Sequence, residues 1–536
     1  MAILQALTQL DFTSWLLLVP ALAVAAHVAL WLADPHGIRS YPGPLLAHFS
    51  DLWLGYIAAQ GHRSEVVHDL HKKHGKFVRI APNHLSISDP DALQVVYGHG
   101  TGTLKADFYD AFVSIQRGLF NTRSRSEHAR KRKIVSHIFS QKSVLEFEPH
   151  VRLYIKQLIQ QWDRLCEAGA RGESGDDGEG GWRGRSGRVW LDCLPWYNYL
   201  AFDIIGDLAF GAPFGMITAA RDAAPVALNH KQAMASYGKE KTDVQYLSAV
   251  EVINNRGTFS ASLGVLPPWM RPLAKMLPWY SQGQEAVKQL AGIAVAAVAQ
   301  RLTTPTDRVD LLGKLQEGRD DDGNLMGKEE LTAEALTQLI AGSDTTSNSS
   351  CAITYFLAKY PDTQRKLQQE LDEALGSDDE AVPTFDQVKR LTYLQAVIDE
   401  ALRIHSTSGI GLPRVVPEGG LTVCGRTFPA GTVLSVPTYT IHRDAEVWGK
   451  DTEEFRPERW FEQDKNAVQK TYNPFSFGPR SCVGRNLASM ELLIILASIL
   501  RRYDFVLEDP DKPFETVEGF LRKPVECVVG IKRRNL

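Results

Sequence analysis

Residues 475–484 read F-S-F-G-P-R-S-C-V-G, and the interpretation of the whole chain starts from them. The apolar-periodic stretch N-L-A-S-M-E-L-L-I-I-L-A-S-I-L comes next and predicts a helix over 485–502. Cys482 therefore lies at a helix start, where the helix dipole and unpaired backbone N–H groups lower the pKa of a thiol. The glycines of the stretch let the backbone pass close to a flat or bulky group, and Arg480 adds a permanent cation.

Three interpretations of Cys482 fit this local chemistry: a metal ligand, a nucleophile, or a structural cysteine in a turn. A cysteine nucleophile needs a partner base. No His, Asp or Glu lies within 471–490, which weakens the nucleophile interpretation without removing it, because a distant residue could supply the base. The three stay open on the local sequence alone.

The composition is that of a globular protein of 536 residues, 44% hydrophobic and 23% charged, so a sizeable buried core is expected. The 59 basic and 63 acidic residues give a net charge of −4, which offers no general electrostatic argument for nucleic acid, and we expect no such partner. The six cysteines are scattered and none forms a C-x-x-C pair. This usage indicates a reducing compartment and argues against a structural zinc site.

Helical periodicity dominates the chain. Helices are predicted over 63–74, 128–140, 145–166, 283–302, 328–358, 362–375, 386–405 and 485–502. A short hairpin is expected at 77–88, where F-V-R-I and L-S-I-S flank A-P-N-H, and strand-like runs lie between 412 and 440. The predicted fold class is mainly α with a small β portion (α+β).

The N-terminal segment has a different character. Trp15–Ala33 contains one strongly polar residue, His27, and has about the length that spans a bilayer. Residues 1–14 contain no Lys or Arg, which argues against a cleaved signal peptide. We expect residues 1–40 to form an uncleaved, single-pass transmembrane anchor and hinge, followed by one catalytic domain over 41–536.

Residues 168–188, A-G-A-R-G-E-S-G-D-D-G-E-G-G-W-R-G-R-S-G-R, are rich in glycine and charge. Such a segment buries little apolar area with which to offset the entropy of ordering. We expect a flexible surface insertion here, and its alternative role as a docking loop is left open.

The stretch 475–484 resembles the haem-ligand signature of the cytochrome P-450 monooxygenases, F-x-x-G-x-R-x-C-x-G, at every fixed position. The resemblance implies that the Cys482 thiolate is the proximal ligand of haem iron, that Phe475 packs beneath the porphyrin and that Arg480 binds a propionate. A thiolate ligand favours O–O cleavage at the iron. Residues 41–536 then form a haem-thiolate monooxygenase domain with haem b as its cofactor.

Three more motifs agree with this family. E-A-L-R at Glu400–Arg403, with Arg459 in F-R-P-E-R-W, is similar to the family's buried charge network, which has a structural role. The stretch L-I-A-G-S-D-T-T-S-N resembles its oxygen-activation motif, which implies that Asp344 and Thr345 deliver protons on the distal side of the haem. On its own, this stretch also fits a kinked polar helix.

Further propionate contacts are implied by resemblance. E-H-A-R-K-R places Arg132 where the family has W-x-x-x-R, and His128 stands in place of the tryptophan. An imidazole can still donate a hydrogen bond. L-P-R places Arg414 on the strand that contributes another contact. The neighbouring cations Arg130, Lys131 and Lys133 fit either a solvated helix face or a docking surface.

The chain has no flavin domain or iron–sulfur cysteine set, so electrons must come from a separate protein. For an anchored member, the family implies an NADPH-dependent cytochrome P-450 reductase, with cytochrome b5 as a further partner. The resemblance also implies an endoplasmic reticulum membrane location, with the catalytic domain in the cytosol.

Val252–Pro272 and two shorter stretches resemble the fungal benzoate para-hydroxylases, which convert benzoate and O2 into 4-hydroxybenzoate. The expected pocket walls are 104–120, 237–259, 406–412 and 519–521, with Tyr109 and Tyr237 as candidate hydrogen-bond donors. Hydroxylation or demethylation of another aromatic or lipophilic substrate is one alternative. A haem-thiolate isomerase or dehydratase and a non-enzymatic haem sensor are two others.

Overall fold

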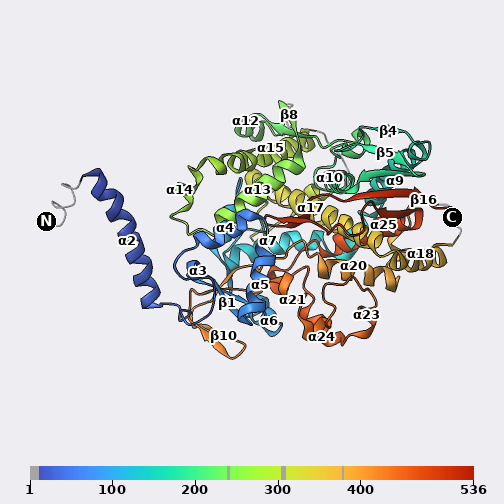
Figure 1. Cartoon of the computed structure of the whole chain (residues 1–536). Helices are drawn as coiled ribbons and strands as arrows, with labels where there is room; N and C mark the ends of the chain where they lie inside the picture. The colour runs from blue at the N-terminus through green and yellow to red at the C-terminus, as the bar shows by residue number, and fades with distance from the viewer. Residues whose placement is uncertain (1–10, 238–241, 304–309, 321, 377–379, 536) are drawn as a thin grey trace.

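The computed structural model describes residues 11–237, 242–303, 310–320, 322–376 and 380–535 (Figure 1). The body is mostly helical, and helix α2 (Phe12–Ala33) projects from one side of it. The end of α2 nearest the body packs against it. The Trp31 ring lies 5.5 Å from that of Phe49, and the Arg39 guanidinium packs on the same indole.

The body is organised around α17 (Lys328–Lys359), a 32-residue helix that crosses its middle (Figure 1). It packs on α10 (Cys193–Phe210), α15 (Ser281–Thr303), α20 (Thr392–Ile404) and α25 (Arg485–Arg502). Helix α10 is buried on nearly all sides. It therefore has no polar face, and amphipathic periodicity did not reveal it.

The other long helices are α5 (Arg63–His74), α7 (Arg125–Ile138), α9 (Glu148–Ala170), α13 (Ala249–Gly264) and α18 (Pro361–Leu375). The shorter helices and turns are α3 (Leu45–Phe49), α4 (Leu52–Gln60), α6 (Asp91–Tyr97), η1 (Asp107–Phe112), α8 (Gln141–Leu145), α11 (Met216–Ala219), α12 (His230–Ala235), α14 (Arg271–Lys275), η2 (Pro278–Tyr280), α16 (Leu311–Glu317), α19 (Phe385–Val388), α21 (Thr438–Ile441), α22 (Ala445–Trp448), α23 (Arg459–Glu462), α24 (Lys465–Thr471) and η3 (Gly478–Arg480).

The first five-stranded sheet joins chain segments some three hundred residues apart. Its order is β1 (Phe77–Ala81), β2 (His84–Ile87), β12 (Val433–Ser435), β9 (Arg414–Val415) and β3 (Leu104–Lys105). Strands β1 and β2 form the predicted antiparallel hairpin, and β12 runs parallel to β2. Strands β3 and β9 are antiparallel, and their register places Lys105 directly opposite Arg414.

The second five-stranded sheet has the order β13 (Tyr503–Leu507), β16 (Val528–Arg533), β6 (Arg188–Asp192), β5 (Trp182–Arg185) and β4 (Ser174–Gly175). The Gly-rich segment 168–188, expected to lack regular structure, contributes β4, β5 and the first residue of β6. Its backbone pairs with a core strand through β6 and β16, and the Trp182 side chain is buried. Main-chain pairing thus supplies the ordering that apolar burial in the segment does not.

Three two-stranded sheets complete the β portion. They are β7 (Ala224–Ala227) with β8 (Val244–Leu247), β10 (Leu421–Val423) with β11 (Arg426–Phe428), and β14 (Thr516–Glu518) with β15 (Arg522–Pro524). The predicted mainly helical class with a small β portion is confirmed. The helix predicted over 386–405 is two helices, α19 and α20, because the chain turns between Val388 and Thr392.

The predicted membrane anchor coincides with α2. The side chains of several α2 residues lie outside the described set. Among the residues that the structure does describe, no helix has the length and apolar character needed to cross a membrane.

Candidate active site

The loop that carries Cys482 is held tightly against α6. The Cys482 amide donates a hydrogen bond to the Phe475 carbonyl at 2.9 Å, which closes the loop on itself. Gly478 has φ of +70°, and a Cβ atom there would lie 2.0 Å from the Tyr97 carbonyl oxygen. Only glycine meets both conditions. This explains why the stretch needs a glycine at this position.

The Cys482 side chain is accessible to solvent, although many protein atoms lie around its sulfur. Burial raises the pKa of this thiol, against the Gly484 amide and the nearby Arg132 and Arg485 guanidinium groups, which favour thiolate. The helix-start argument predicted a lowered pKa and was wrong for the protein alone, because desolvation is the larger effect. A metal cation at the sulfur reverses that balance.

Five cationic or titratable side chains gather beside this loop. Arg132 donates to the Ser481 carbonyl at 2.6 Å, Arg480 to the Thr122 carbonyl at 2.7 Å, and Arg414 to the Tyr109 hydroxyl at 2.8 Å. We call the group the cation cluster: Lys105, His128, Arg132, Arg414 and Arg480. Sequence reasoning found four of its members and missed Lys105. The sequence offered only one indication of Lys105, which is that a cation lies in the predicted pocket wall 104–120.

The cation cluster contains mutually repelling charges. Burial and the neighbouring cations lower the pKa of Lys105 well below its ordinary value, that of Arg480 to about 10 and that of His128 to about 3. Lys105 and Arg414 are direct cross-strand neighbours, an arrangement that destabilises a sheet when the charges are alike. Among the described residues no carboxylate forms an ion pair with any member of the cluster. The cluster is therefore a ready site for an anionic group, such as the propionates of haem.

Helix α17 presents one partly exposed face within its buried length. Ala341 is exposed, and Thr337, Ile340, Gly342 and Thr345 are partly exposed. The Thr345 hydroxyl donates to the Ala341 carbonyl at 2.7 Å. One residue on, Thr346 is buried and donates to Glu491 at 2.9 Å, a contact that joins α17 to α25, the helix that follows Cys482.

Asp344 is buried, although the neighbouring Thr345 is partly exposed. Burial raises the pKa of Asp344 to about 6, partly offset by the positive charge of Lys523 in β15. Adjacent residues of a helix do not face each other. Thr345 therefore lies on the partly exposed face of α17, whereas Asp344 lies on a buried one.

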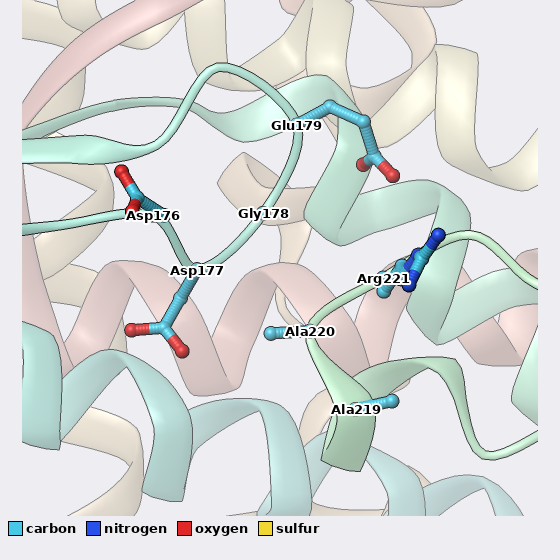
Figure 2. A pocket seen from close by; sticks show the side chains of 7 residues that line it. All are labelled: Asp176, Asp177, Gly178, Glu179, Ala219, Ala220 and Arg221. Atoms are coloured by element: carbon cyan, nitrogen blue, oxygen red, sulfur yellow. The ribbon is translucent and has the colours of Figure 1, made fainter.

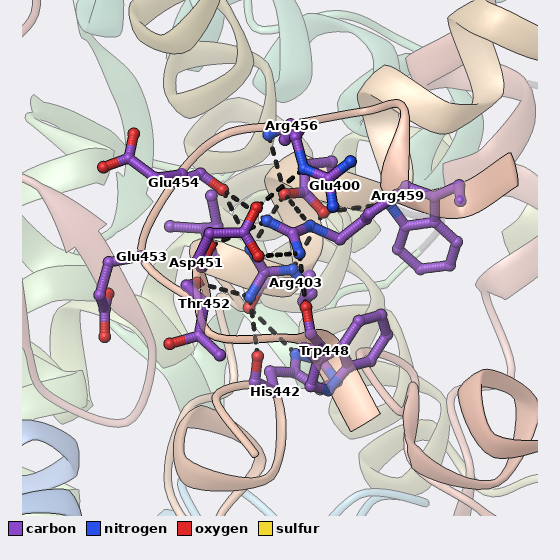
Figure 3. Close-up of polar contacts among 12 residues, drawn as sticks. Glu400, Arg403, His442, Trp448, Asp451, Thr452, Glu453, Glu454, Arg456 and Arg459 are labelled. Carbon is purple, nitrogen blue, oxygen red and sulfur yellow. Dashed lines mark hydrogen bonds and ion pairs between the residues drawn. The ribbon is translucent and has the colours of Figure 1, made fainter. Parts of the chain in front are cut away.

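The charge network predicted around Glu400 is fully buried (Figure 3). Glu400 pairs with Arg403 at 2.9 Å and with Arg459 at 2.8 Å, and all three side chains have no exposed area. Arg459 also pairs with the Asp451 carboxylate at 3.1 Å, and the other guanidinium N–H groups donate to carbonyl groups of the 442–454 segment. We call these three residues the Glu400 network.

The Glu400 network is linked to the cysteine loop through His442. The Nδ1 of His442 bonds with the Arg403 carbonyl at 3.1 Å, and its Nε2 accepts from the Asn473 amide at 3.0 Å. Asn473 lies two residues before Phe475. The network is thus connected through His442 to the start of the cysteine loop, in keeping with the structural role that the sequence indicated.

Three of the four predicted pocket walls, 104–120, 406–412 and 519–521, contribute to one aromatic cluster. Its members are Phe108, Tyr109, Phe112, Phe120, Ala261, Ile410, Leu412 and Phe520. Phe112, Phe120 and Phe520 are mutual neighbours, with ring centroids 5.0 to 5.7 Å apart. Of the two candidate donors, Tyr109 belongs to this cluster and its hydroxyl accepts from Arg414. Tyr237 lies in the main core and bonds with Thr332, so the structure does not bring it to the aromatic cluster.

Two other features lie away from these residues. The hollow in Figure 2 is lined by Asp176, Asp177, Glu179 and Arg221 together with Gly178, Ala219 and Ala220. None of these residues belongs to the cysteine loop, the cation cluster or the aromatic cluster. Cys193, Cys351 and Cys527 are buried with their sulfur atoms within 4.8 Å of one another. Both neighbouring thiols form hydrogen bonds that lower the pKa of Cys527 to about 5.

Comparison with known proteins adds to this geometry. The family model described as cytochrome P450 matches residues 40–530. A benzoate 4-monooxygenase (bphA) of Aspergillus niger is 50% identical over 523 residues, which cover 96% of each chain. A cytochrome P450 monooxygenase (poxM) of Penicillium oxalicum is 31% identical over 88% of this chain and 84% of its own. Another (atr2), of Stereocaulon alpinum, is 31% identical over 93% and 92%.

Proposed function

The chain belongs to the cytochrome P450 family and is a haem-dependent monooxygenase, and from this premise we propose that it hydroxylates benzoate to 4-hydroxybenzoate. The observation that carries the proposal is the 50% identity, over almost the full length of both chains, to a protein named for that reaction. The aromatic cluster supports it, since the cluster offers flat apolar surfaces suited to a single benzene ring.

The residues of the site fit haem. Cys482 would ligate the iron, and Phe475 would pack below the macrocycle. The cation cluster would hold the propionates, because it supplies positive charge that the described residues leave without an acid. When bound, a thiolate-ligated haem supplies the activation of dioxygen. The remaining chemistry of the reaction falls to the chain's own groups.

Thr345 and Asp344 form the proposed proton path. The Thr345 hydroxyl lies on the partly exposed face of α17, where it would hand on a proton from its Oγ atom. Asp344 has a pKa of about 6, so its carboxyl group can take up and release a proton near neutral pH. Since the two lie on different sides of α17, the path between them needs a water molecule or a side-chain rotation.

We propose that electrons come from NADPH through a separate cytochrome P450 reductase, with cytochrome b5 as a further partner. The cations Arg130 and Lys131 of α7 do not form a free docking surface for it, because they pair with Glu330 of α17. The docking role of α7 stays a prediction.

The location of the protein is also a proposal: residues 1–40 attach the catalytic domain to the cytosolic face of the endoplasmic reticulum. The sequence of Trp15–Ala33 supports it. Deleting residues 1–33 should shift the protein from the membrane pellet to the supernatant while its haem content stays the same. Persistent sedimentation of the truncated protein with membranes would count against this segment as the anchor.

The substrate is tested by titrating the purified haem protein with benzoate while recording the Soret band. We expect a high-spin shift with benzoate and NADPH- and O2-dependent formation of 4-hydroxybenzoate. A shift only with a larger apolar aromatic compound would leave the monooxygenase and exclude benzoate. Product formation without NADPH would favour an isomerase or dehydratase, and binding without any turnover would favour a haem sensor.

A further inference from the structure

We propose that Arg256 of α13 forms a carboxylate-binding site that anchors the acid group of an aromatic substrate and presents the opposite end of its ring for reaction. The inference rests on the proposed function, because it identifies how that substrate is held. It adds a residue that sequence analysis did not identify. Val252–Pro272 contains Arg256, but nothing in the sequence separates it from the many other arginines.

Arg256 is a buried cation with an incomplete set of partners. Its side chain is 7% exposed. One terminal nitrogen, Nη2, donates to the Phe112 carbonyl at 2.6 Å, and that acceptor carries no charge. The Nε–H group is buried and has no hydrogen-bond partner. A buried donor without a partner is costly, more so when the group is charged.

Among the described residues, no acid compensates this charge. Desolvation alone lowers the pKa of Arg256 to about 10, and among the described residues no carboxylate contributes to it. Buried arginines are normally paired. A ligand carboxylate would supply both the missing charge and an acceptor for the Nε–H group. A guanidinium group binds a carboxylate through two parallel hydrogen bonds, which also fixes its orientation.

Two other buried arginines near this region each have an acid. Arg271 of α14 donates to the carbonyls of Leu266, Asp107 and Gly264 and pairs with the Asp107 carboxylate at 3.3 Å. Arg63 of α5 has an Nη1 atom without a hydrogen-bond partner, but it interacts electrostatically with the buried acid Glu518, which raises its pKa against the effect of burial. Arg256 differs from both because it has no such acid among the described residues.

The position of Arg256 fits a substrate anchor. Its guanidinium carbon lies 5.0 Å from the centroid of the Phe112 ring. Phe112 packs against Phe120 and Phe520, and Lys105 of the cation cluster lies over the Phe120 ring at 4.9 Å. The aromatic cluster therefore stands between Arg256 at one end and the proposed propionate site at the other. A benzene ring among these side chains, with its carboxylate on Arg256, would direct its para carbon away from the anchor.

Other polar groups near Arg256 are also incomplete. Ser260 lies one turn further along α13, is fully buried, and its hydroxyl has no partner. The amide of Asn121 donates to the same Phe112 carbonyl as Arg256, while its side-chain oxygen is unpaired. Ser260 is suited to donate a second hydrogen bond to a carboxylate.

The test compares an acid with its neutral isostere. Wild type, Arg256→Gln and Arg256→Lys, each loaded with haem, are titrated with benzoate and with benzamide by the Soret shift. Because a hydrogen bond to a charged group contributes about 1.5–3 kcal/mol, the Kd for benzoate should rise about 10- to 100-fold in Arg256→Gln. The Kd for benzamide should change little, and Arg256→Lys should be intermediate. Arg271→Gln is the matched control and should leave the ratio of the two Kd values unchanged.

Each outcome decides a different claim. Equal benzoate affinity in wild type and Arg256→Gln overturns the anchor while the proposed function stands. An equal loss for benzoate and benzamide assigns Arg256 a structural role and also overturns the anchor. Should Arg256→Gln fail to retain haem, Arg256→Lys decides in its place, because it keeps a cation and loses the forked geometry.

Failure of the proposed function gives a distinct result. If wild type shows no shift with benzoate, the same variants are titrated with 2-naphthoate and 2-naphthamide. A preference of wild type for the acid that is lost in Arg256→Gln would support the carboxylate site with a different substrate. No preference for either acid in wild type would overturn the site together with the benzoate assignment.

Discussion

The Glu400 network and the cation cluster both bury arginine side chains, but only the first buries the acid that balances them. In the Glu400 network two guanidinium groups share the Glu400 carboxylate, Arg459 also pairs with Asp451, and the other N–H groups donate to backbone carbonyls. In the cation cluster Lys105 and Arg414 face each other across two strands with no acid between them. A buried charge balanced within the chain holds the fold, whereas one left unbalanced marks where a ligand of opposite charge binds.

The largest effect is expected from Cys482→Ala, which removes the iron ligand and leaves the cation cluster intact. The variant should fold and should lose haem-thiolate binding and all turnover. The measurement is the absorbance of the reduced carbonyl complex. Its normal appearance would refute Cys482 as the ligand.

Glu400→Gln tests the Glu400 network, the group in which the buried charges are balanced. It removes the acid that Arg403 and Arg459 share and leaves Arg459 with only the partly exposed Asp451 carboxylate, and breaking a buried ion pair costs about 3–5 kcal/mol. Thermal unfolding should show a large loss of stability together with reduced haem content. Glu462→Gln is the control, because the Glu462 carboxylate is 57% exposed and its partner Arg456 also pairs with Asp451, so its removal should cost little. Similar melting temperatures for the two variants would contradict the structural role of the network.

Glu491 extends the comparison to a buried acid that has no cation. Burial raises its pKa from an ordinary 4.5 to about 8, and Thr346 donates to it. The folded state therefore binds the proton more tightly than the unfolded state. Stability should be highest below pH 4.5 and should fall, by a few kcal/mol, as the pH rises toward 8. Glu491→Gln should keep the hydrogen bond and flatten this fall, as measured by unfolding at pH 5 and pH 8. A wild-type profile that is flat over this range would show that Glu491 is not perturbed.

Thr345→Ala sharpens the distinction between groups that serve the fold and groups that serve the reaction. The hydroxyl bonds only within its own helix, so haem content and melting temperature should change little. Product formed per NADPH should fall, by about tenfold if the hydroxyl supplies one hydrogen bond's worth of barrier lowering, or about 1.4 kcal/mol. Peroxide should account for the missing electrons. Unchanged coupling would exclude the proton path.

Lys105→Met tests the cation cluster, in which the buried charges are not balanced. Of these variants, it should have the smallest effect on the fold. It removes one buried cation from a group of like charges, so the haem-free protein should be as stable as wild type, or more stable by about 1 kcal/mol. Haem should dissociate faster from the variant, because one propionate partner is lost. A haem-free variant that is clearly less stable would mean that Lys105 holds the fold instead.

The sequence by itself determined the features that depend on local pattern. Helical periodicity located α5, α17 and α25 closely, since side chains three and four residues apart share a face wherever the helix packs. The stretch 475–484 identified Cys482, because it combines a glycine that no other residue could replace with a fixed cysteine. The residues of this stretch are consecutive, so they can be recognised without knowing which distant segments pack against them.

Only the tertiary structure decided which charges are balanced. Lys105 and Arg414 are about three hundred residues apart in the chain, and their opposition exists only because β3 pairs with β9. Arg256 resembles Arg271 in sequence, and the lack of an acid beside it becomes visible only when α13 packs on η1. The ordering of residues 168–188 likewise required pairing with distant β16. Electrostatic and strand-pairing energies depend on distance in space, which a local pattern does not contain.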